Sequence, residues 1–311
     1  MNSTALHELQ SRVRGEVLFE EPLATYTTYR IGGPAAALVT PASTEDVVRT
    51  LEFAAESGAR WLALGLGSNV LVSDSGFDGV VIRLGKGLDD VTCGVGGDET
   101  VWTVGAGTPT PLLARRTAKA GLAGVQRLIG VPGTVGGGVF MNAGAHGQDF
   151  SQVARSVELV EADGSVKLVD GGDIEWRYRS SGLGNRVVVG ATVTLSPADP
   201  KELEREVRSY LDRRKSGTPF NEPCCGSVFR NPTWPEGEEP EGPRTAGQMI
   251  DALGLKGYRV GGAEVSRKHA NYIVNTGGAI ARDVLSVIEH LRDRVQKEFG
   301  VELQPEVETI D

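Results

Sequence analysis

The sequence of 311 residues predicts an α+β fold divided into more than one domain. At about 150 residues per domain, the chain is long enough for two or three hydrophobic cores. Short apolar runs bounded by glycine turns alternate with amphipathic segments of helical length. Glycine supplies 42 residues, nearly twice the ~7% of an average protein, which indicates tight turns and close approaches of the backbone to a ligand or to other chain segments.

The first clear helix is predicted over residues 43–58. Ser43 or Thr44 is a typical residue to cap its start, and Gly58 is a typical residue to end it. Apolar residues at helical spacing are expected on one face: Val47, Val48, Leu51 and Ala55.

Two strands follow, over residues 61–64 and 80–84, with a glycine loop at residues 65–69 after the first of them. The middle of the chain then predicts a strand from Val101 and an amphipathic helix near residues 110–120, before a segment that is dense in glycine.

Alternating strands complete the middle region. Residues 157–160 and 166–169 flank an Asp163-Gly164 turn and predict a β-hairpin. A further strand is predicted over residues 187–195.

Helices lengthen in the last region, over residues 201–215 and 282–299. Between them, residues 232–244 are acidic and rich in proline and glycine, which indicates a surface loop. One face of the final helix is predicted to be buried: Val284, Leu285, Val287, Ile288, Leu291, Val295 and Phe299.

Composition excludes several classes of protein. A net charge of −9 argues against a nucleic-acid binder, which needs a basic face. No run of about 18 apolar residues occurs and the first residues lack a secretory pattern, so we expect no membrane insertion and a cytoplasmic location. The three cysteines form no Cys-x-x-Cys pair and the four histidines are scattered, so reduced thiols and no metal site are expected.

The common nucleotide-binding motifs are absent. Residues 65–70 follow a predicted strand but have Val70 where a Rossmann fingerprint needs its third glycine, and no Gly-Lys-Ser/Thr completes a P-loop. Two other glycine segments, at residues 28–35 and 129–137, could present consecutive backbone N–H groups as concave nests for a pyrophosphate, although each alone is more typical of an ordinary turn.

Together these segments resemble the UDP-N-acetylenolpyruvoylglucosamine reductase family, also called UDP-N-acetylmuramate dehydrogenase. The resemblance runs from about Tyr26 to the C-terminus, and the motifs occur in the family's order. The matching segments are TTYRIGGPA at 27–35, LGLGSNVLV at 64–72, IGVPGTVGG at 129–137, MNAGA at 141–145, YRSS at 178–181, GSVFRNP at 226–232, GLKGYRVGGA at 254–263, HANYIVN at 269–275 and LQPEV at 303–307.

The resemblance implies a two-part FAD-binding fold of the vanillyl-alcohol-oxidase type, followed by an α+β substrate-binding domain. We expect the first FAD-binding subdomain at residues 1–78, the second at 79–199 and the substrate-binding domain at 200–300. The tail at residues 301–311 is expected to pack back on the first subdomain.

It also implies an activity in peptidoglycan precursor synthesis, and so in cell wall biogenesis, cell shape and cell division. NADPH reduces a non-covalently bound FAD and leaves. The enolpyruvyl ether of UDP-N-acetylglucosamine then receives hydride from flavin N5 at its terminal alkene carbon, which yields UDP-N-acetylmuramate. No oligomeric state follows from the sequence.

By the same resemblance, Ser227 protonates the carbon next to the carboxylate, while Arg179 and Glu306 stabilise the intermediate. The chemistry agrees, because hydride addition builds negative charge toward the carboxylate oxygens, where a fixed guanidinium stabilises the intermediate more than the ground state. A serine hydroxyl is a poor acid in water, so it needs a nearby cation or a water chain; Lys215 is the candidate cation.

Further residues follow from the matching motifs. Substrate-binding residues are expected to be Lys215, Asn231, Tyr178 and Arg230. FAD-binding residues are expected to be Arg30, Ile31, Gly32, Gly33, Gly65, Gly67, Ser68, Asn69, Pro132, Gly133, Thr134, Gly136, Gly137, Asn142, Ala143 and Gly144.

Each of these residues also has an ordinary structural interpretation. Arg179 ends a charged run typical of a solvated strand face. Ser227 after a glycine is a common turn residue, and Asn231 before a proline is another. Lys215 at the end of a predicted helix complements the helix dipole without any ligand, and Glu306 is one acid among several in the tail.

The chain departs from the family pattern in two places. Only a short run separates Arg179 from the strand at Val187, as in the subtype that lacks a longer loop with a substrate-covering tyrosine. Cys224 and Cys225 stand before the Gly-Ser pair, where small or amide residues are usual; Cys225 is interpreted as a small buried thiol, with an oxidation-sensitive site as the alternative.

Two other functions fit parts of the sequence. An FAD-dependent oxidase acting on an alcohol or lactone would use the same scaffold, but the segments at 226–232 and 305–307 argue against it. A nucleotide-binding module without catalysis would be favoured by a purified protein that is colourless and does not bind FAD.

Overall fold

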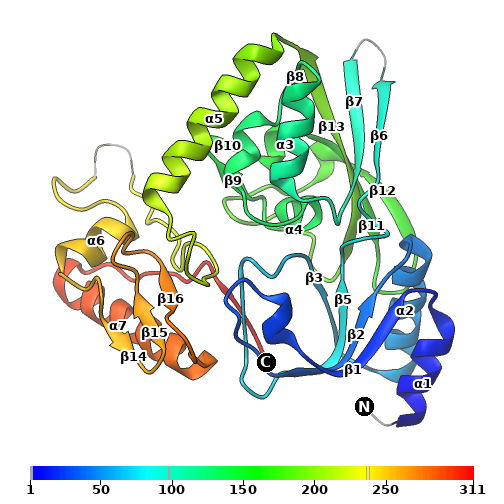
Figure 1. Cartoon of the computed structure of the whole chain (residues 1–311), viewed down its shortest axis with the longest axis horizontal. Helices are drawn as coiled ribbons and strands as arrows, with labels where there is room; N and C mark the ends of the chain where they lie inside the picture. The colour runs from blue at the N-terminus through cyan, green and yellow to red at the C-terminus, as the bar shows by residue number, and fades with distance from the viewer. Residues whose placement is uncertain (1–2, 97–98, 236, 238) are drawn as a thin grey trace. The chain divides into compact units, whose positions relative to one another are not determined.

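The computed structural model describes residues 3–96, 99–235, 237 and 239–311 (Figure 1). They group into two compact units, each assembled from separate stretches of chain. Unit 1 comprises Met1–Glu21, Ala35–Leu66 and Asp78–Arg214, and unit 2 comprises Pro22–Pro34, Gly67–Phe77 and Lys215–Asp311. The domain boundaries expected at 78/79 and 199/200 remain a prediction.

The first sheet of unit 1 has the strand order β1-β2-β5-β3, and its two helices lie on one face (Figure 1). β3 and β5, which fall in the two predicted strand regions, pair with each other in parallel. The elements are α1 (Ser3–Arg12), β1 (Glu16–Pro22), β2 (Pro34–Thr40), α2 (Thr44–Ser57), β3 (Trp61–Leu64) and β5 (Phe77–Arg83).

Helix α2 confirms the helix predicted over residues 43–58. Gly58 ends it in the left-handed conformation, at φ +69°. Val47 and Leu51 are buried as expected, but Ala55 is exposed and Ala54 is buried in its place. Residues 47, 51 and 54 are spaced by four and three positions and so lie on one face of the helix, whereas Ala55 is turned toward solvent.

The start of α2 depends on a buried carboxylate rather than on a side-chain cap from Ser43. Asp46 is 1% exposed, and its two oxygens accept hydrogen bonds from the backbone N–H groups of Arg14 (2.9 Å), Gly15 (2.9 Å) and Ala42 (2.8 Å). One side chain therefore ties the segment before β1 and the end of β2 to the first turn of α2.

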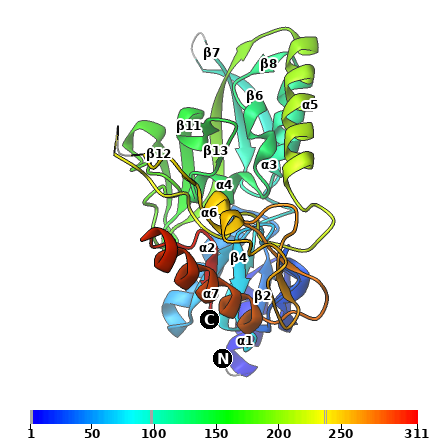
Figure 2. The same cartoon turned by 90° about the vertical axis from the view of Figure 1, so that its left-hand side faces the viewer.

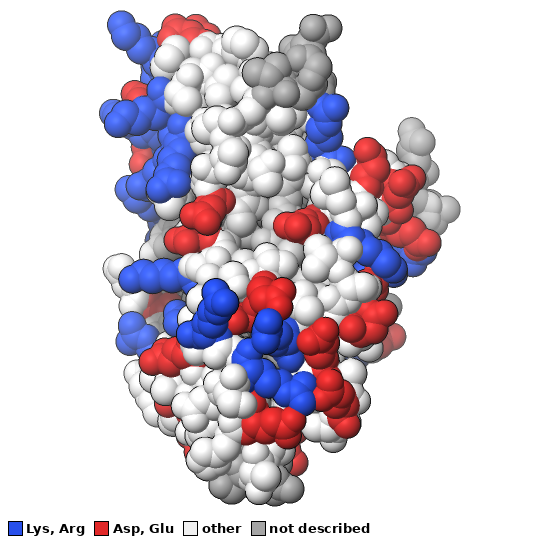
Figure 3. Space-filling model, turned by 90° about the vertical axis from the view of Figure 1, so that its right-hand side faces the viewer, with Lys and Arg blue, Asp and Glu red and all other residues white. Residues whose placement is uncertain are grey.

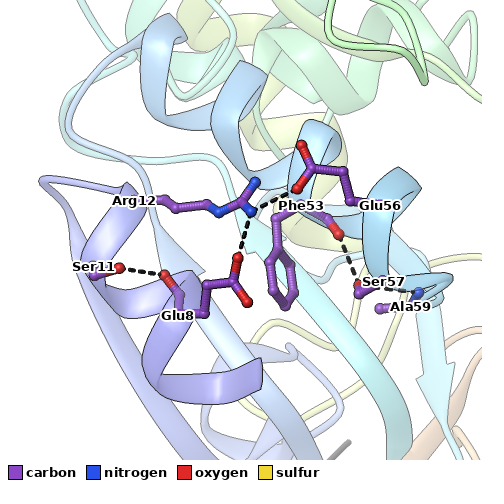
Figure 4. Close-up of polar contacts among 7 residues, drawn as sticks. All are labelled: Glu8, Ser11, Arg12, Phe53, Glu56, Ser57 and Ala59. Atoms are coloured by element: carbon purple, nitrogen blue, oxygen red, sulfur yellow. Dashed lines mark hydrogen bonds and ion pairs between the residues drawn. The ribbon is translucent and has the colours of Figure 1, made fainter. Parts of the chain in front are cut away.

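A surface ion pair joins α1 to α2 (Figure 4). The Arg12 guanidinium contacts the carboxylates of Glu8 and Glu56 and lies 5.5 Å from the centre of the Phe53 ring. These hydrogen bonds, first of all that to Glu56, raise the pKa of Arg12, and the hydrogen bond from Arg12 lowers the pKa of Glu56. Because both partners reach solvent, the pair adds little to stability.

The second sheet of unit 1 is antiparallel, with the order β12-β11-β13-β7-β6. Its hairpin forms as predicted: Val160 is opposite Val166, and Gly164 has φ +86° in the turn. β13 is the central strand, and the short β8 pairs with its end. The elements are β6 (Val91–Gly96), β7 (Glu99–Gly105), β8 (Leu122–Ala123), β11 (Ala154–Val160), β12 (Val166–Asp170) and β13 (Val187–Pro197).

The described part of unit 1 also contains three further α-helices, three 3-10 turns and the short antiparallel pair of β9 (Gly144–Ala145) and β10 (Gln148–Asp149). α4 (Val135–Phe140) packs against β13, and α3 (Thr110–Lys119) packs against η2 (Gln126–Gly130). α5 (Pro200–Gly217), whose residues up to Arg214 belong to unit 1, covers α3 and η2 with Leu203 and Val207. This arrangement leaves the glycine-dense segment between η2 and α4.

Unit 2 contains a small antiparallel sheet covered by helix α7 (Figure 2). The C-terminal strand pairs in parallel with β4, so the tail returns to residues 70–72. The elements are β4 (Val70–Val72), α6 (Ala246–Ala252), β14 (Arg259–Val260), β15 (Ala263–Val265), β16 (Ile273–Asn275), α7 (Ala281–Phe299) and β17 (Glu308–Ile310).

The buried face of α7 differs from the prediction at one position. Val284, Val287, Ile288, Leu291 and Val295 are buried, and Phe299 is partly buried. Leu285 is 39% exposed, so its predicted burial is wrong: each residue turns about 100° around the helix, which carries Leu285 off the stripe begun by Val284.

The loop predicted over residues 232–244 is irregular and lies in unit 2; its residues 236 and 238 lie outside the described part of the chain. Trp234 packs against the core of unit 2 and donates its indole N–H to the carbonyl of Arg244 (3.1 Å). The loop is therefore anchored at its two ends.

Charged side chains of both signs are intermixed over the lower part of the face in Figure 3, while Lys and Arg gather along its upper left edge. Within the described residues, no helix combines the length and the apolar character needed to cross a lipid bilayer.

We predict that Asp46→Ala lowers the free energy of unfolding by about 2–4 kcal/mol, because it removes a buried carboxylate that accepts three partly buried backbone hydrogen bonds. The neighbouring Glu45→Ala removes only a surface ion pair with Arg49 and should change stability by less than about 0.5 kcal/mol. Urea unfolding of both variants measures the difference; equal losses would show that Asp46 has no special role.

Candidate active site

Ser227 lies in an irregular segment of unit 2, and it is partly buried. Gly226, just before it, has φ +87°, a conformation that costs a residue with a side chain free energy. The carbonyl of Pro223 accepts from the N–H of Asn275 (2.8 Å), and that of Cys224 accepts from the Thr28 hydroxyl (2.6 Å). The approach to Ser227 is therefore fixed by backbone contacts from two distant segments.

The residues after Ser227 are held next to Glu306. The carbonyl of Val228 accepts from the N–H of Glu306 (2.7 Å), and the N–H of Arg230 donates to the carbonyl of Gln304 (2.9 Å). Phe229 and Pro305 form an antiparallel bridge. Unit 2 thus brings together two of the three predicted catalytic residues, although 79 positions separate them in the sequence (306 − 227).

Asn69 also contributes to the placement of Glu306. Its side-chain amide donates to the Glu306 carbonyl (3.0 Å), and its own carbonyl accepts from the N–H of Glu308 (3.0 Å). Asn69, which is predicted to bind FAD, therefore contacts the segment that carries Glu306.

Cys225 is a small buried thiol, 1% exposed. Burial raises the pKa of Cys225, which keeps it in the unreactive thiol form. Tyr29, also fully buried, lies against it, and burial likewise raises the pKa of Tyr29. The side chain before the Gly-Ser pair is therefore part of the core of unit 2.

Arg179 lies in unit 1, at the corner of a tight turn rather than on the strand face that its charged neighbours suggest. Arg177 and Ser180 exchange backbone hydrogen bonds (2.8 and 3.1 Å) across the turn. Arg179 has φ +59°, which is uncommon for a residue with a side chain, and its guanidinium lies 4.8 Å from the centre of the Tyr178 ring. The turn holds both side chains on one short element.

Two buried side chains attach this turn to the end of α4. Asn142 donates to the carbonyl of Arg177 (3.0 Å) and accepts from the N–H of Ser151 (3.0 Å), and the Ser181 hydroxyl donates to the carbonyl of Phe140 (2.6 Å). Asn142 is one of the predicted FAD-binding residues, and both the NH₂ and the carbonyl oxygen of its side chain are hydrogen-bonded to protein groups. It thereby links the Arg179 turn to the glycine-dense segment.

In that segment, the loop after β3 meets the loop before α4. A Cβ added at Gly65 would lie 2.6 Å from the Thr134 hydroxyl, so only glycine allows this approach. Thr134 caps α4 by accepting from the N–H of Gly137. The remaining predicted FAD residues of unit 1 are Pro132, Gly133, Gly136, Ala143 and Gly144.

The predicted nest of free N–H groups is wrong for the later part of this segment. The N–H of Val135 donates to the carbonyl of Thr108 (2.8 Å), and that of Gly136 donates to the carbonyl of Ala106 (2.9 Å). Gly136 allows the start of α4 to pack closely against Ala106, which follows β7, because a Cβ at Gly136 would lie 2.7 Å from the Cβ of Ala106.

The other predicted FAD residues form adjacent loops of unit 2. Thr28 donates its N–H to the carbonyl of Gly67 (3.0 Å), and Gly33 donates to the carbonyl of Ser73 (2.9 Å). Ile31 is buried in the core, whereas Arg30 is exposed with φ +56°. The loop residues that the prediction included are Arg30, Ile31, Gly32, Gly33, Gly67, Ser68 and Asn69.

The predicted substrate residues are also divided between the units. Tyr178 is half exposed beside Arg179 in unit 1, while Lys215, Arg230 and Asn231 belong to unit 2. The Asn231 side chain accepts from the N–H of Ala246 at the start of α6 (3.3 Å), and Nε of Arg230 is buried without a hydrogen-bond partner.

His269 lies in the motif at 269–275, but it is not among the site residues predicted from the sequence. Lys268, just before it, donates to the carbonyl of Lys215. Burial, together with the nearby Lys256, lowers the pKa of His269 and favours its neutral form. A basic group in unit 2 therefore comprises Lys215, Lys256, Lys268 and His269.

The two units carry different parts of the predicted catalytic set. In unit 2 a serine lies beside a segment that bears a carboxylate, and in unit 1 a forked cation lies on a short turn whose backbone is held by hydrogen bonds. Within the described residues, no group of three or more His, Cys, Asp or Glu side chains is arranged to hold a metal ion.

Two family descriptions match separate parts of the chain. The FAD binding domain matches residues 35–170. The C-terminal domain of UDP-N-acetylenolpyruvoylglucosamine reductase matches residues 218–310, which include Ser227 and Glu306.

Relatives resemble the chain over nearly its whole length. A UDP-N-acetylenolpyruvoylglucosamine reductase of Halalkalibacterium halodurans is 43% identical over 95% of both chains, and one of Bacillus subtilis is 39% identical over 98% of this chain and 97% of its own. The crystal structure of the Thermus caldophilus enzyme superimposes with a TM-score of 0.78 at 35% identity, covering 96% of this chain and 99% of that one. The predicted FAD-binding fold followed by an α+β domain is thus confirmed, and the chain belongs to the UDP-N-acetylenolpyruvoylglucosamine reductase family.

Proposed function

We propose that this protein reduces the enolpyruvyl ether of UDP-N-acetylglucosamine to UDP-N-acetylmuramate, with NADPH as the hydride donor and FAD as the carrier. The observation that carries the proposal is the pairing of residues 228–230 with 304–306, which holds Ser227 beside Glu306 in a chain of this family. The product is a precursor of peptidoglycan, and the proposed location is the cytoplasm.

The residues present fit FAD. The contact between Gly65 and Thr134 leaves no room for a Cβ, so the loop after β3 packs directly on the start of α4, within the residues that match an FAD binding domain. In unit 2, Gly32, Gly33 and Gly67 allow similarly close packing of the loops predicted to contact FAD. When bound, the flavin accepts hydride from NADPH and passes it to the terminal alkene carbon of the substrate.

Ser227 supplies the proton in this proposal. The left-handed Gly226 and the fixed backbone at Val228 limit the positions that its hydroxyl can reach. A serine is a weak acid, so acidity must come from cations in its surroundings. Lys215 is the proposed source, and Glu306 is proposed to stabilise the intermediate from the adjacent segment.

Arg179 is proposed to bind the substrate carboxylate, which gains negative charge as the hydride arrives. A guanidinium forms two parallel hydrogen bonds with a carboxylate, so it can both orient the group and stabilise the developing charge. Its turn is held by Asn142 and Ser181, which limits the motion of the backbone that carries it.

The basic group of unit 2 is proposed to receive the diphosphate of the UDP-sugar. The Lys268 ammonium binds the backbone carbonyl of Lys215, so the two lysines are neighbours. A protein of net charge −9 needs such local positive charge at any site for a polyanion. Arg230, Asn231 and Tyr178 are proposed as further substrate contacts.

We predict that the purified protein is yellow and that NADPH bleaches the colour under anaerobic conditions. Addition of the enolpyruvyl UDP-sugar should restore the colour, because the substrate removes the hydride. Stopped-flow absorbance follows both steps. If saturating substrate does not restore the colour while oxygen with an alcohol or lactone supports turnover, the protein is an oxidase instead.

Ser227→Ala should leave bleaching by NADPH within about 2-fold of wild type and slow reoxidation by substrate about 10²- to 10⁴-fold, the usual contribution of a general acid. Ser73→Ala is the matched control, since Ser73 is a partly buried serine of unit 2 that bonds to Ser75. Equal slowing of both steps in Ser227→Ala would contradict a role in proton delivery.

Arg179→Lys should slow reoxidation by substrate about 10- to 100-fold, because lysine keeps the charge but loses the forked geometry. Arg177→Lys changes an exposed residue of the same turn, paired with Glu175, and should leave both steps unchanged. The same stopped-flow assay compares them, and identical behaviour of the two variants would remove Arg179 from the mechanism.

A further inference from the structure

The side chain of Asn271 forms an unusual contact with the segment that follows Ser227. Its carbonyl oxygen accepts from the N–H of Phe229 (3.0 Å), and its NH₂ donates to the carbonyl of the same residue (2.8 Å). The backbone carbonyl of Asn271 accepts from the N–H of Val228 (2.9 Å). One residue therefore bonds three of the four backbone polar groups of Val228 and Phe229.

The contact is dry. Asn271 is 4% exposed, and Val228 and Phe229 are each 1% exposed, so no bulk water can replace a lost partner. The fourth polar group, the Val228 carbonyl, accepts from Glu306. Asn271 and residues 304–307 thus share the backbone of Val228 and Phe229 between them.

Asparagine is the side chain that this contact requires. Phe229 presents one donor and one acceptor, and a primary amide presents the complementary pair on a single short side chain. An ionised aspartate offers acceptors only, so one of its oxygens would face the Phe229 carbonyl. A neutral aspartic acid has the same shape as asparagine and regains a donor.

The position of the contact relates it to proton delivery. Before Ser227, Gly226 adopts a left-handed conformation that glycine takes up at little cost. After Ser227 comes Val228, whose N–H donates to the backbone carbonyl of Asn271. The Asn271 N–H in turn donates to Nδ1 of His269 (3.1 Å), within the basic group described above.

We propose that Asn271 is a positioning residue that sets the Ser227 hydroxyl for proton transfer, acting through the backbone of Val228 and Phe229. The inference rests on the proposed function, in which Ser227 is the acid. Loss of the Asn271 side chain leaves the segment paired with residues 304–306, so the fold remains while the hydroxyl shifts. A displacement of about 1 Å is enough to slow a positioned reaction about 100-fold.

The test is Asn271→Asp, followed through both half-reactions from about pH 5.5 to about pH 8.5, where a buried carboxyl with a raised pKa titrates. Each rate is divided by the wild-type rate at the same pH, which cancels pH effects that are common to both proteins. At high pH reoxidation by substrate should be about 100-fold slower than wild type, and at low pH it should recover to within about 5-fold, because the neutral carboxyl restores the donor. Bleaching by NADPH should stay within about 2-fold throughout.

Asn271→Ala and Thr276→Val serve as comparisons. Asn271→Ala should slow reoxidation at every pH, without recovery. Thr276 follows β16 and donates its hydroxyl to the carbonyl of Gly262. Thr276→Val removes this hydrogen bond, which does not involve Val228, so the variant should leave both steps unchanged. Thermal melting of each variant, recorded at low and high pH, reports the folded fraction used for each rate.

Three results would overturn the proposal. The first is a ratio of the Asn271→Asp to the wild-type reoxidation rate that does not change with pH, and the second is equal slowing of both half-reactions. The third is an Asn271→Ala variant that reoxidises within about 3-fold of the wild-type rate, far from the expected effect. The proposed function has its own separate readout in Ser227→Ala. If that variant slows reoxidation and the Asn271 variants do not, only the positioning role fails; if Ser227→Ala reoxidises normally, both fail.

Discussion

The candidate chemistry depends on a short stretch of backbone whose polar groups are fully used. Val228 and Phe229 donate and accept through all four of their N–H and C=O groups, with partners in Asn271 and in Glu306. Because these residues are buried, each unmade bond would cost free energy that water cannot return. The partly buried Ser227 is therefore attached to a constrained stretch of backbone in unit 2, and the tail that carries Glu306 is fixed by the same contacts.

Unit 1 uses a similar device for its cation. Arg179 lies in a turn with a positive φ, and the turn is held by Asn142 and Ser181 at the end of α4. In both units the predicted catalytic side chain projects from a short irregular segment that contains a left-handed residue, and the neighbouring backbone is hydrogen-bonded to buried side chains of the same unit. Sites of this kind are precise because the supporting contacts, and not the loops themselves, determine the geometry.

The regular elements could be predicted from local patterns. The spacing of Val47 and Leu51, the Asp163-Gly164 turn and the apolar stripe of α7 each encode an element in consecutive residues. Leu285 and Ala55 show the limit, since the edge of a helical stripe depends on what packs against it. The motif resemblance supplied the candidate residues, but the contacts of Asn69, Asn142 and Asn271 join segments distant in sequence. An asparagine in a motif gives no sign of which backbone it will bond, and the N–H groups of Val135 and Gly136, expected to be free, donate to the carbonyls of Thr108 and Ala106.

The central claim is that the fixed segment presents the Ser227 hydroxyl to the substrate carbon next to the carboxylate. A crystal structure of the oxidised protein with the enolpyruvyl UDP-sugar bound tests it most directly. The account predicts that Oγ of Ser227 lies within about 3.5 Å of that carbon, the separation of groups poised to react, with the Arg179 guanidinium on the carboxylate. A substrate bound with this carbon facing another acid or open solvent, and with Ser227 directed away from it, would contradict the account.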